Sequence, residues 1–164
     1  MTKYNETAVM NCAGGYGKGL EELATMHRDF FMLCKHLAKV KNMAVVFLAH
    51  TGMEKIKDSP SETADYSVYS LDMPKKSASV YVANSDAVLY LTKEKFITGS
   101  EVNKKGQTTK YGKVTETGNR ILVTNSDGRT GFTSAKNRYG LETEIQVPHG
   151  TNPLLTQINF FKQA

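Results

Sequence analysis

Apolar residues recur at every third or fourth position between Leu20 and Val40, and charged residues fill many of the positions between them. This spacing predicts an amphipathic α-helix over 20–40. After a short break comes the apolar run Met43–Ala49, which is continuous and partly β-branched. Such a run is typical of a strand buried on both faces, as in a parallel sheet, and a helix that leads into it suits a βαβ unit.

The segments around this helix and strand predict a mixed set of elements. Residues 7–12 have the composition of a short strand. Residues 51–74 are polar and have no sustained period, which predicts a long loop of the kind that is usually functional. A short helix is predicted over 75–83 and another buried strand over 86–91.

The second half of the chain changes character, because short strand-like runs alternate there with turn signals. This alternation predicts antiparallel β structure. The predicted strands are 95–102, 108–115, 120–124 and 131–135. A terminal helix is predicted over 153–161, with Asn152 as its N-cap.

These elements predict an α/β fold with mostly parallel central strands and a C-terminal antiparallel β extension. The 164 residues suit one domain. Within it we expect an α/β core portion at about 14–92, an antiparallel portion at 93–147 and a terminal helix at 152–164. The longest apolar run is too short to span a membrane, and two cysteines do not make a disulfide framework. We therefore expect a cytoplasmic protein with no membrane partner.

The formal net charge of +5 comes from one segment, 93–138, which holds ten cations and four anions. A basic segment of this kind attracts the phosphates of nucleic acid or nucleotide. The alternative is a solvated hairpin that carries lysines on its exposed edges. Charge alone does not decide between them.

A glycine-rich loop at 14–19 invites comparison with the phosphate-binding motif G-x-x-x-x-G-K-[ST]. Aligning Gly17 and Lys18 with that motif puts Cys12 at the first glycine and Gly19 at the hydroxyl that binds magnesium. Two of the four defining positions therefore fail, and we expect a loop before a helix rather than a nucleotide cradle. A small kinase-like enzyme that uses this loop is a further alternative.

The order of the predicted elements resembles the later half of a RecA-like ATPase core. It is especially similar to the small phage-encoded ATPases that act in single-strand annealing and recombination. The resemblance covers about 14–145. Its most specific parts are the strand end Leu48-Ala-His50 and the motif Lys136-Asn-Arg138-Tyr-Gly140.

The resemblance implies roles for three residues. His50 stands where the family has a polar sensor of the γ-phosphate. Lys136 and Arg138 match a pair of cations that cross a subunit boundary and bind the nucleotide of the neighbouring protomer. The alternatives are a histidine that only hydrogen-bonds the following loop and two surface cations on an edge strand.

The resemblance also implies two DNA-facing loops, at 12–18 and 51–76. The first offers an aromatic ring for stacking and a cation for phosphate, a combination that suits single strands. The second carries several lysines among acidic residues, which weaken its attraction for DNA. The candidate residues are Tyr16, Lys18, Lys55, Lys57, Lys75 and Lys76.

A complete core of this family has a phosphate-binding loop and an acidic strand end before the first DNA-facing loop, and neither pattern occurs upstream of Gly14. We therefore expect the isolated chain to bind no metal and not to hydrolyse ATP, with ATP and Mg²⁺ used only in an assembled or complete form. The expected partners are single-stranded DNA and either further copies of the chain or a full-length ATPase. The alternative is a non-enzymatic protein that binds single-stranded DNA or a partner.

Overall fold

The computed structural model divides the chain into two compact units, Met1–Ser85 and Asp86–Ala164. They are called unit 1 and unit 2 below, and the expectation of a single domain stays a prediction. The residues that the structure describes are 9–56, 66–99, 101–102, 108–110, 112–126, 132 and 134–162. Within these ranges, no helix combines the length and the apolar character that a membrane crossing requires.

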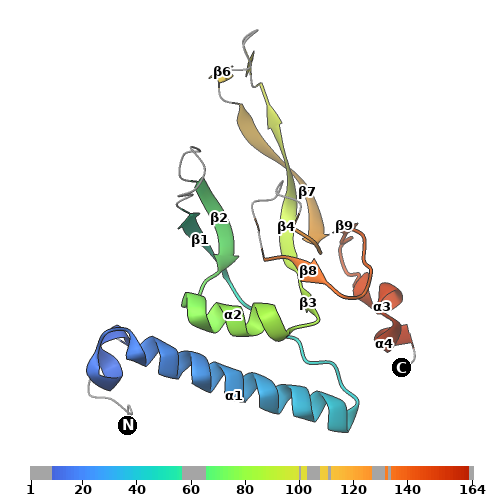
Figure 1. The fold of residues 1–164 in the computed structure, drawn as a ribbon. Helices are drawn as coiled ribbons and strands as arrows, with labels where there is room; N and C mark the ends of the chain where they lie inside the picture. The colour runs from blue at the N-terminus through green and yellow to red at the C-terminus, as the bar shows by residue number, and fades with distance from the viewer. Residues whose placement is uncertain are drawn as a thin grey trace. The chain divides into compact units, whose positions relative to one another are not determined.

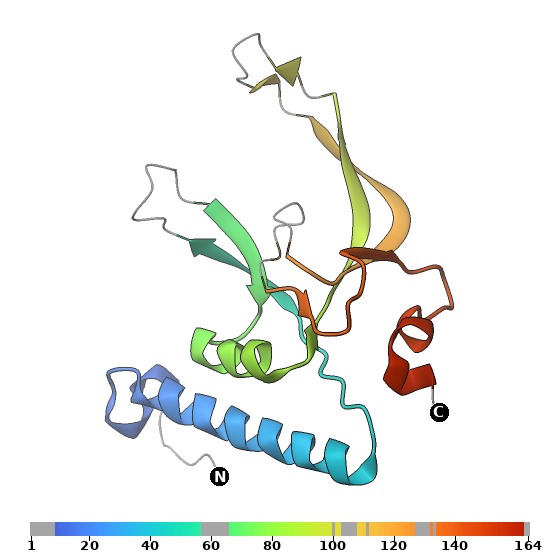
Figure 2. The same ribbon diagram turned by 45° about the vertical axis from the view of Figure 1, so that its right-hand side comes forward.

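Unit 1 is built around α1 (Lys18–Lys41), which confirms the predicted long helix. It buries Ala24 and Phe31 one heptad apart on a single face. The shorter helix α2 (Lys75–Asn84) lies alongside that helix in both views and confirms the second helix prediction (Figures 1 and 2). The segment before α1 is a 3-10 turn, η1 (Val9–Gly14), so residues 9–12 do not form the predicted strand.

The strand predicted at Met43–Ala49 is absent, and this prediction was wrong. The segment has no strand partner, because the two strands described in unit 1 pair with each other. Phe47 instead stacks on Phe31 of α1, with ring centroids 5.6 Å apart, while Leu48 is 93% exposed. The apolar run therefore contributes mainly one ring to the packing of the helices, rather than two buried faces to a sheet.

The segment expected to be a long loop contains an antiparallel hairpin of β1 (Thr51–Ile56) and β2 (Tyr66–Leu71). Its register runs from Thr51 opposite Leu71 to Ile56 opposite Tyr66. Val68 is the buried side chain of this hairpin in the part that the structure describes. With so little apolar alternation, the period-two signal of a strand was too weak to read from the sequence.

Unit 2 is mainly antiparallel β structure, as predicted for the C-terminal half. Its strands pair in the orders β4–β7–β9, β3–β8 and β5–β6. Their bounds are β3 (Ala87–Val88), β4 (Tyr90–Thr98), β5 (Glu101–Val102), β6 (Thr108–Lys110), β7 (Lys113–Val123), β8 (Lys136–Asn137) and β9 (Glu144–Gln146). The structure thus mixes helices and strands, which confirms the predicted class in part. Every strand pair among the described residues is antiparallel, and the expected parallel centre is not found among them.

The long strand β7 joins the end of the predicted strand 108–115 to most of the predicted strand 120–124. Its pairing with β4 jumps from Arg120 opposite Lys93 to Glu116 opposite Lys95, so residues 117–119, where the sequence has a turn signal, form a bulge. Gly118 within the bulge has φ of +84°, which favours glycine. The turn signal therefore marks an irregular backbone, but the chain does not reverse there and continues in the same strand.

The core of unit 2 lies on both faces of the C-terminal end of β7, because alternate residues of a strand point to opposite sides. Val123 packs on one side with Phe132, whose ring stacks on Tyr90 at 4.7 Å. Leu122 packs on the other side in a cluster with Ile158. These two clusters hold the sheet and the C-terminal segment together.

Two predictions for the last part of the chain need correction. The strand expected at 131–135 is reduced to an isolated bridge at Phe132 among the described residues. The terminal helix is split at buried, extended Ile158 into α3 (Leu154–Gln157) and α4 (Asn159–Lys162). The N-cap of α3 is Pro153 and not Asn152, as was predicted, although Asn152 Oδ1 accepts the Leu154 N–H at 3.1 Å.

Candidate functional site

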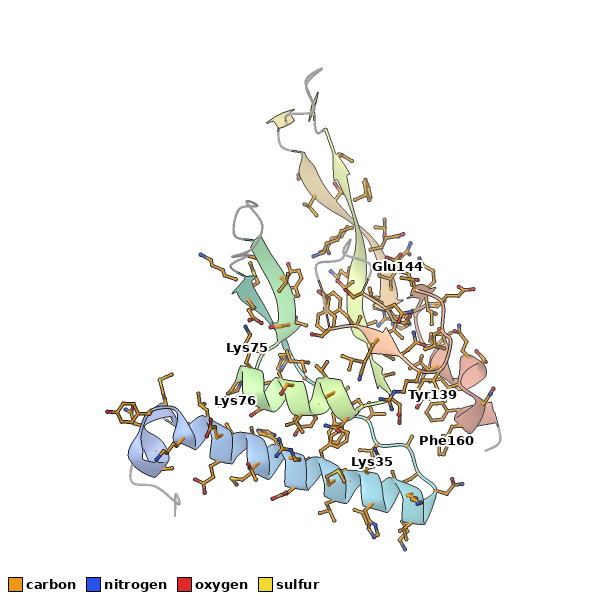
Figure 3. The ribbon with its side chains drawn as sticks, in the orientation of Figure 1. Lys35, Lys75, Lys76, Tyr139, Glu144 and Phe160 are labelled. Atoms are coloured by element: carbon orange, nitrogen blue, oxygen red, sulfur yellow. The ribbon has the colours of Figure 1, made fainter. Side chains whose placement is uncertain are left out.

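A surface hollow of about 280 Å³ lies in unit 1 where α1 and α2 begin. Residues from the two predicted DNA-facing loops form its walls, so the fold brings these distant segments together. Figure 3 shows Lys75 and Lys76 at the start of α2, the end that lies nearest the start of α1. The lining residues are Tyr16, Gly17, Leu20, Pro74, Lys75 and Lys76.

Both helices direct their N-terminal ends at this hollow. The N-cap of α1 is Gly17 and that of α2 is Pro74, and neither makes a side-chain capping hydrogen bond. The N-terminus of a helix carries a partial positive charge and unsatisfied N–H groups, which favour an anion. Two such ends and the ammonium groups of Lys75 and Lys76 contribute positive charge at this hollow, and the carboxylates paired with the two lysines offset part of it.

Tyr16 stands at the rim on a tight loop. Its φ is +52°, its side chain is fully exposed, and Gly15 and Gly17 on either side also have positive φ. This backbone turns the ring away from the unit and into solvent. An exposed aromatic ring beside cations is the arrangement on which a nucleic-acid base stacks.

Each lysine of the hollow already has an acidic partner. Lys76 Nζ lies 2.5 Å from Glu21 Oε1, and Lys75 forms an ion pair with Glu54. The hydrogen bond and charge of Lys76 hold the pKa of the Glu21 carboxyl below its ordinary value. Exposed ion pairs of this kind are weak, so phosphate can replace the carboxylates, although at some cost in affinity.

The other DNA-facing candidates lie close by in sequence or space. Lys18 is the exposed first residue of α1 and directly follows Gly17. Lys55, on β1, lines a second hollow of about 630 Å³, to which Lys75 also belongs. Lys57 lies outside the residues that the structure describes. Most of the candidates therefore surround two hollows that share one lysine.

The glycine-rich loop does not fit a magnesium–nucleotide complex. A Cβ atom on Gly19 would lie 1.9 Å from the carbonyl oxygen of Val9, so the serine or threonine of a phosphate-binding loop has no room there. Cys12 at the first glycine position is buried. The close packing of Gly19 and Cys12 accounts for the residues of this loop, and we assign no step of phosphoryl transfer to the loop.

The two predicted nucleotide-contacting cations lie in unit 2. Lys136 is in β8 opposite Val88, and Arg138 is the first residue after β8. Arg138 Nη1 lies 3.0 Å from Asp86 Oδ1, and the Arg138 N–H donates to the Asp86 carbonyl at 3.0 Å. Both side chains of this pair are more than half exposed. The ion pair between Asp86 and the Arg138 guanidinium was not predicted from the sequence.

Asn137, between the two cations, fixes their segment. Its Oδ1 accepts the N–H groups of Tyr139 at 3.2 Å and Leu141 at 2.9 Å. Its Nδ2 donates to the carbonyl of Thr124 at 3.3 Å and to that residue's Oγ1 at 3.2 Å. Asn137 therefore has a structural role in the Lys136-Asn-Arg138 motif, beside the nucleotide-binding role predicted for the two cations.

His50 belongs to unit 1, where it is exposed and precedes β1 rather than ending a buried strand. Its carbonyl accepts the Asp72 N–H at 2.9 Å, next to the base of the hairpin. This bond involves only the backbone of His50, so the sensor role and its alternative both stay predictions. In the described ranges, no three His, Cys, Asp or Glu side chains gather as a metal site would require.

Comparison with protein families gives one match, to a family model described as an AAA domain, over residues 3–138. The match covers most of the chain and includes the hollow of unit 1 and the Lys136–Arg138 segment of unit 2. No curated protein and no solved structure matches the chain.

Proposed function

This chain belongs to the AAA domain family of P-loop-type ATPases, and from that premise we propose that it is the DNA-binding portion of a RecA-like ATPase. The process that we propose is phage recombination or single-strand annealing. In this proposal the fold is a partial RecA-like core, and single-stranded DNA binds at the hollow of unit 1. The nucleotide site is completed by another protomer or by a full-length partner.

One observation carries the DNA-binding proposal: two helix N-termini without a side-chain cap, two lysines and an exposed tyrosine surround the same hollow. The cations and helix ends favour phosphate groups, and the Tyr16 ring favours a stacked base. A ligand that fits the hollow therefore carries phosphates and bases close together. Single-stranded DNA offers them repeatedly and with unstacked bases. Stacking on one aromatic ring contributes about 1–3 kcal/mol per base, which makes Tyr16 a major contributor.

Fluorescence anisotropy with a labelled oligothymidine tests this proposal. We expect Tyr16→Ala and the double variant Lys75→Gln/Lys76→Gln each to weaken binding about tenfold or more. The double variant also lowers the slope of log affinity against log salt by about 1.4, since each phosphate contact on a single strand contributes about 0.7. Circular dichroism checks that each variant remains folded.

A matched control is available at the other end of α1. Lys39 and Lys41 are exposed, and Lys39→Gln/Lys41→Gln changes the net charge by the same amount far along the helix from the hollow. We expect this control to weaken binding by about threefold or less. Equal losses in the two double variants would mean that net charge, rather than the hollow, determines affinity.

The second part of the proposal concerns the nucleotide. Lys136 and Arg138 project from one short segment, and we propose that they contact ATP and Mg²⁺ bound by an adjacent protomer, with His50 as the γ-phosphate sensor of the complete assembly. The support is the family membership together with the exposure of the guanidinium and its positioning by Asp86.

ATP turnover measured with a family member that has a complete phosphate-binding loop tests this second part. We expect little or no turnover from the chain alone and turnover in the mixture above that of the partner alone. Arg138→Ala removes the added turnover, whereas Lys39→Gln leaves it unchanged. Oligothymidine binding without added turnover would favour the alternative, a non-enzymatic protein that binds single-stranded DNA or a partner.

A further inference from the structure

Asp86 and Arg138 lie opposite each other at the end of the ladder that β3 and β8 form as neighbouring strands (Figure 1). The register that pairs Ala87 with Asn137 continues by one residue to this pair, and the Arg138 N–H donates to the Asp86 carbonyl at 3.0 Å. Side chains of directly opposed residues lie within reach of each other. The pairing of two short strands therefore brings a carboxylate to the guanidinium from a position 52 residues away in the chain.

The ion pair between these two residues holds the guanidinium without covering it. Arg138 Nη1 lies 3.0 Å from Asp86 Oδ1, and 61% of the Arg138 side chain is exposed. A guanidinium has five N–H donors in a planar fork, and one contact with a carboxylate oxygen leaves other donors for a phosphate. Asp86 and a phosphate can therefore bind Arg138 at the same time.

The ion pair contributes little to the stability of the fold, because both side chains are more than half exposed and exposed ion pairs are weak. Its main effect is on the conformational freedom of the arginine. A free arginine side chain samples many rotamers, and the need to order such a side chain weakens the binding of a ligand by about two- to tenfold. A guanidinium that Asp86 already holds avoids most of this loss.

Asn137 and Asp86 order different parts of this segment. Asn137 accepts the backbone N–H groups of Tyr139 and Leu141 and so fixes the main chain that follows Arg138. Asp86 contacts the Arg138 side chain. The main chain and the guanidinium are therefore held by two separate residues.

The phenol of Tyr139 responds to both members of the ion pair. Burial raises the pKa of Tyr139, the Asp86 carboxylate raises it further, and the Arg138 guanidinium lowers it. A negative charge disfavours the tyrosinate and a positive charge favours it. The titration of Tyr139 therefore reports whether each of the two charges lies beside the phenol.

We propose that Asp86 is a positioning residue for Arg138: its carboxylate holds the guanidinium in the place from which it reaches a phosphate of ATP bound by an adjacent protomer. This inference rests on the nucleotide-contacting role proposed for Arg138. It adds that Asp86 orders the arginine in the isolated chain, before any nucleotide is bound. Removing the carboxylate therefore impairs the arginine without removing it.

ATP turnover in a mixture with a family member that has a complete phosphate-binding loop tests the positioning role. We expect Asp86→Ala to lower the kcat of the added turnover by about two- to tenfold and to leave the KM for ATP unchanged, because the complete family member holds the nucleotide. Asp86→Glu keeps a carboxylate and is expected to retain most of the added turnover. Glu116→Ala is the matched control, since it removes an acid of unit 2 that pairs with Lys93 at 2.8 Å and is expected to change neither constant.

The outcomes separate this inference from the proposed function. Added turnover that persists in Arg138→Ala would refute the role of the arginine and, with it, the positioning role of Asp86. Added turnover that is lost in Arg138→Ala but unchanged in Asp86→Ala would overturn the positioning role alone. Urea denaturation checks that Asp86→Ala is no less stable than Glu116→Ala.

A pH titration of the chain alone, followed by NMR of ¹³C-labelled tyrosine, tests the arrangement without any other protein. Tyr139→Phe identifies the signal of Tyr139. We expect Asp86→Asn to lower the pKa of Tyr139, because it removes the charge that disfavours the tyrosinate, and Arg138→Ala to raise that pKa. A Tyr139 titration that neither variant shifts would mean that the two charges do not lie beside the phenol, and it would overturn the proposed arrangement.

Discussion

Asn137 should be the residue whose side-chain hydrogen bonds contribute most to the stability of unit 2. Asn137→Ala removes an acceptor from the N–H groups of Tyr139 and Leu141 and two donor contacts from Thr124. Thr124 is fully buried and Leu141 nearly so, so water cannot readily replace the lost partners. A net contribution near 1 kcal/mol per bond, reduced for the three longer bonds, gives a loss of about 2–3 kcal/mol.

Urea denaturation followed by circular dichroism measures this loss as a change in the free energy of unfolding. Asn119→Ala is the matched control, because Asn119 is exposed and its Nδ2 makes one bond, to Glu94 at 3.2 Å. We expect the control to cost about 0.5 kcal/mol or less. Losses that agree within error for the two variants would refute the view that Asn137 organises the segment between Lys136 and Arg138.

Three further predictions concern unit 1. Glu21→Gln should tighten oligothymidine binding by about two- to fivefold, because it frees Lys76; unchanged affinity would contradict the role of that lysine. Lys76 lowers the pKa of Glu21, so their ion pair stabilises the fold fully above the ordinary carboxyl pKa of 4.5. This stabilisation is lost as the pH falls through the lowered pKa of Glu21. Acid titration of Lys76→Gln should therefore show a smaller loss of stability than wild type. Gly19→Ala should lower the free energy of unfolding by about 1–3 kcal/mol, since its Cβ would meet the Val9 carbonyl, and a neutral result in urea melts would argue against the tight loop.

The helices were predictable from sequence because their signals are local. The apolar period of α1 extends over six turns, and the Asn42 that ends it takes the left-handed conformation that asparagine tolerates. The strand at Met43–Ala49 was wrongly predicted because its composition does not specify whether other strands are present to pair with it. The hairpin that begins at Thr51 was missed because polar and apolar residues do not alternate regularly along either of its strands.

The residues of the hollow were predictable one by one, but their assembly was not. Tyr16 and Lys75 are far apart in the chain, and only the packing of α1 against α2 brings their loops to one place. The ion pairs that hold the lysines depend on the same packing. Asp86 was missed for a related reason, because its pairing with Arg138 requires β3 and β8 to be neighbours.

The central claim is that single-stranded DNA binds where the two helices of unit 1 begin. A titration of ¹⁵N-labelled protein with oligothymidine, followed by amide chemical shifts, tests it most directly. We expect the largest shifts at Gly15–Gly19 and at Lys75–Ser77, the residues that surround the hollow. Shifts confined to the basic strands of unit 2, with none at these two helix starts, would contradict the claim.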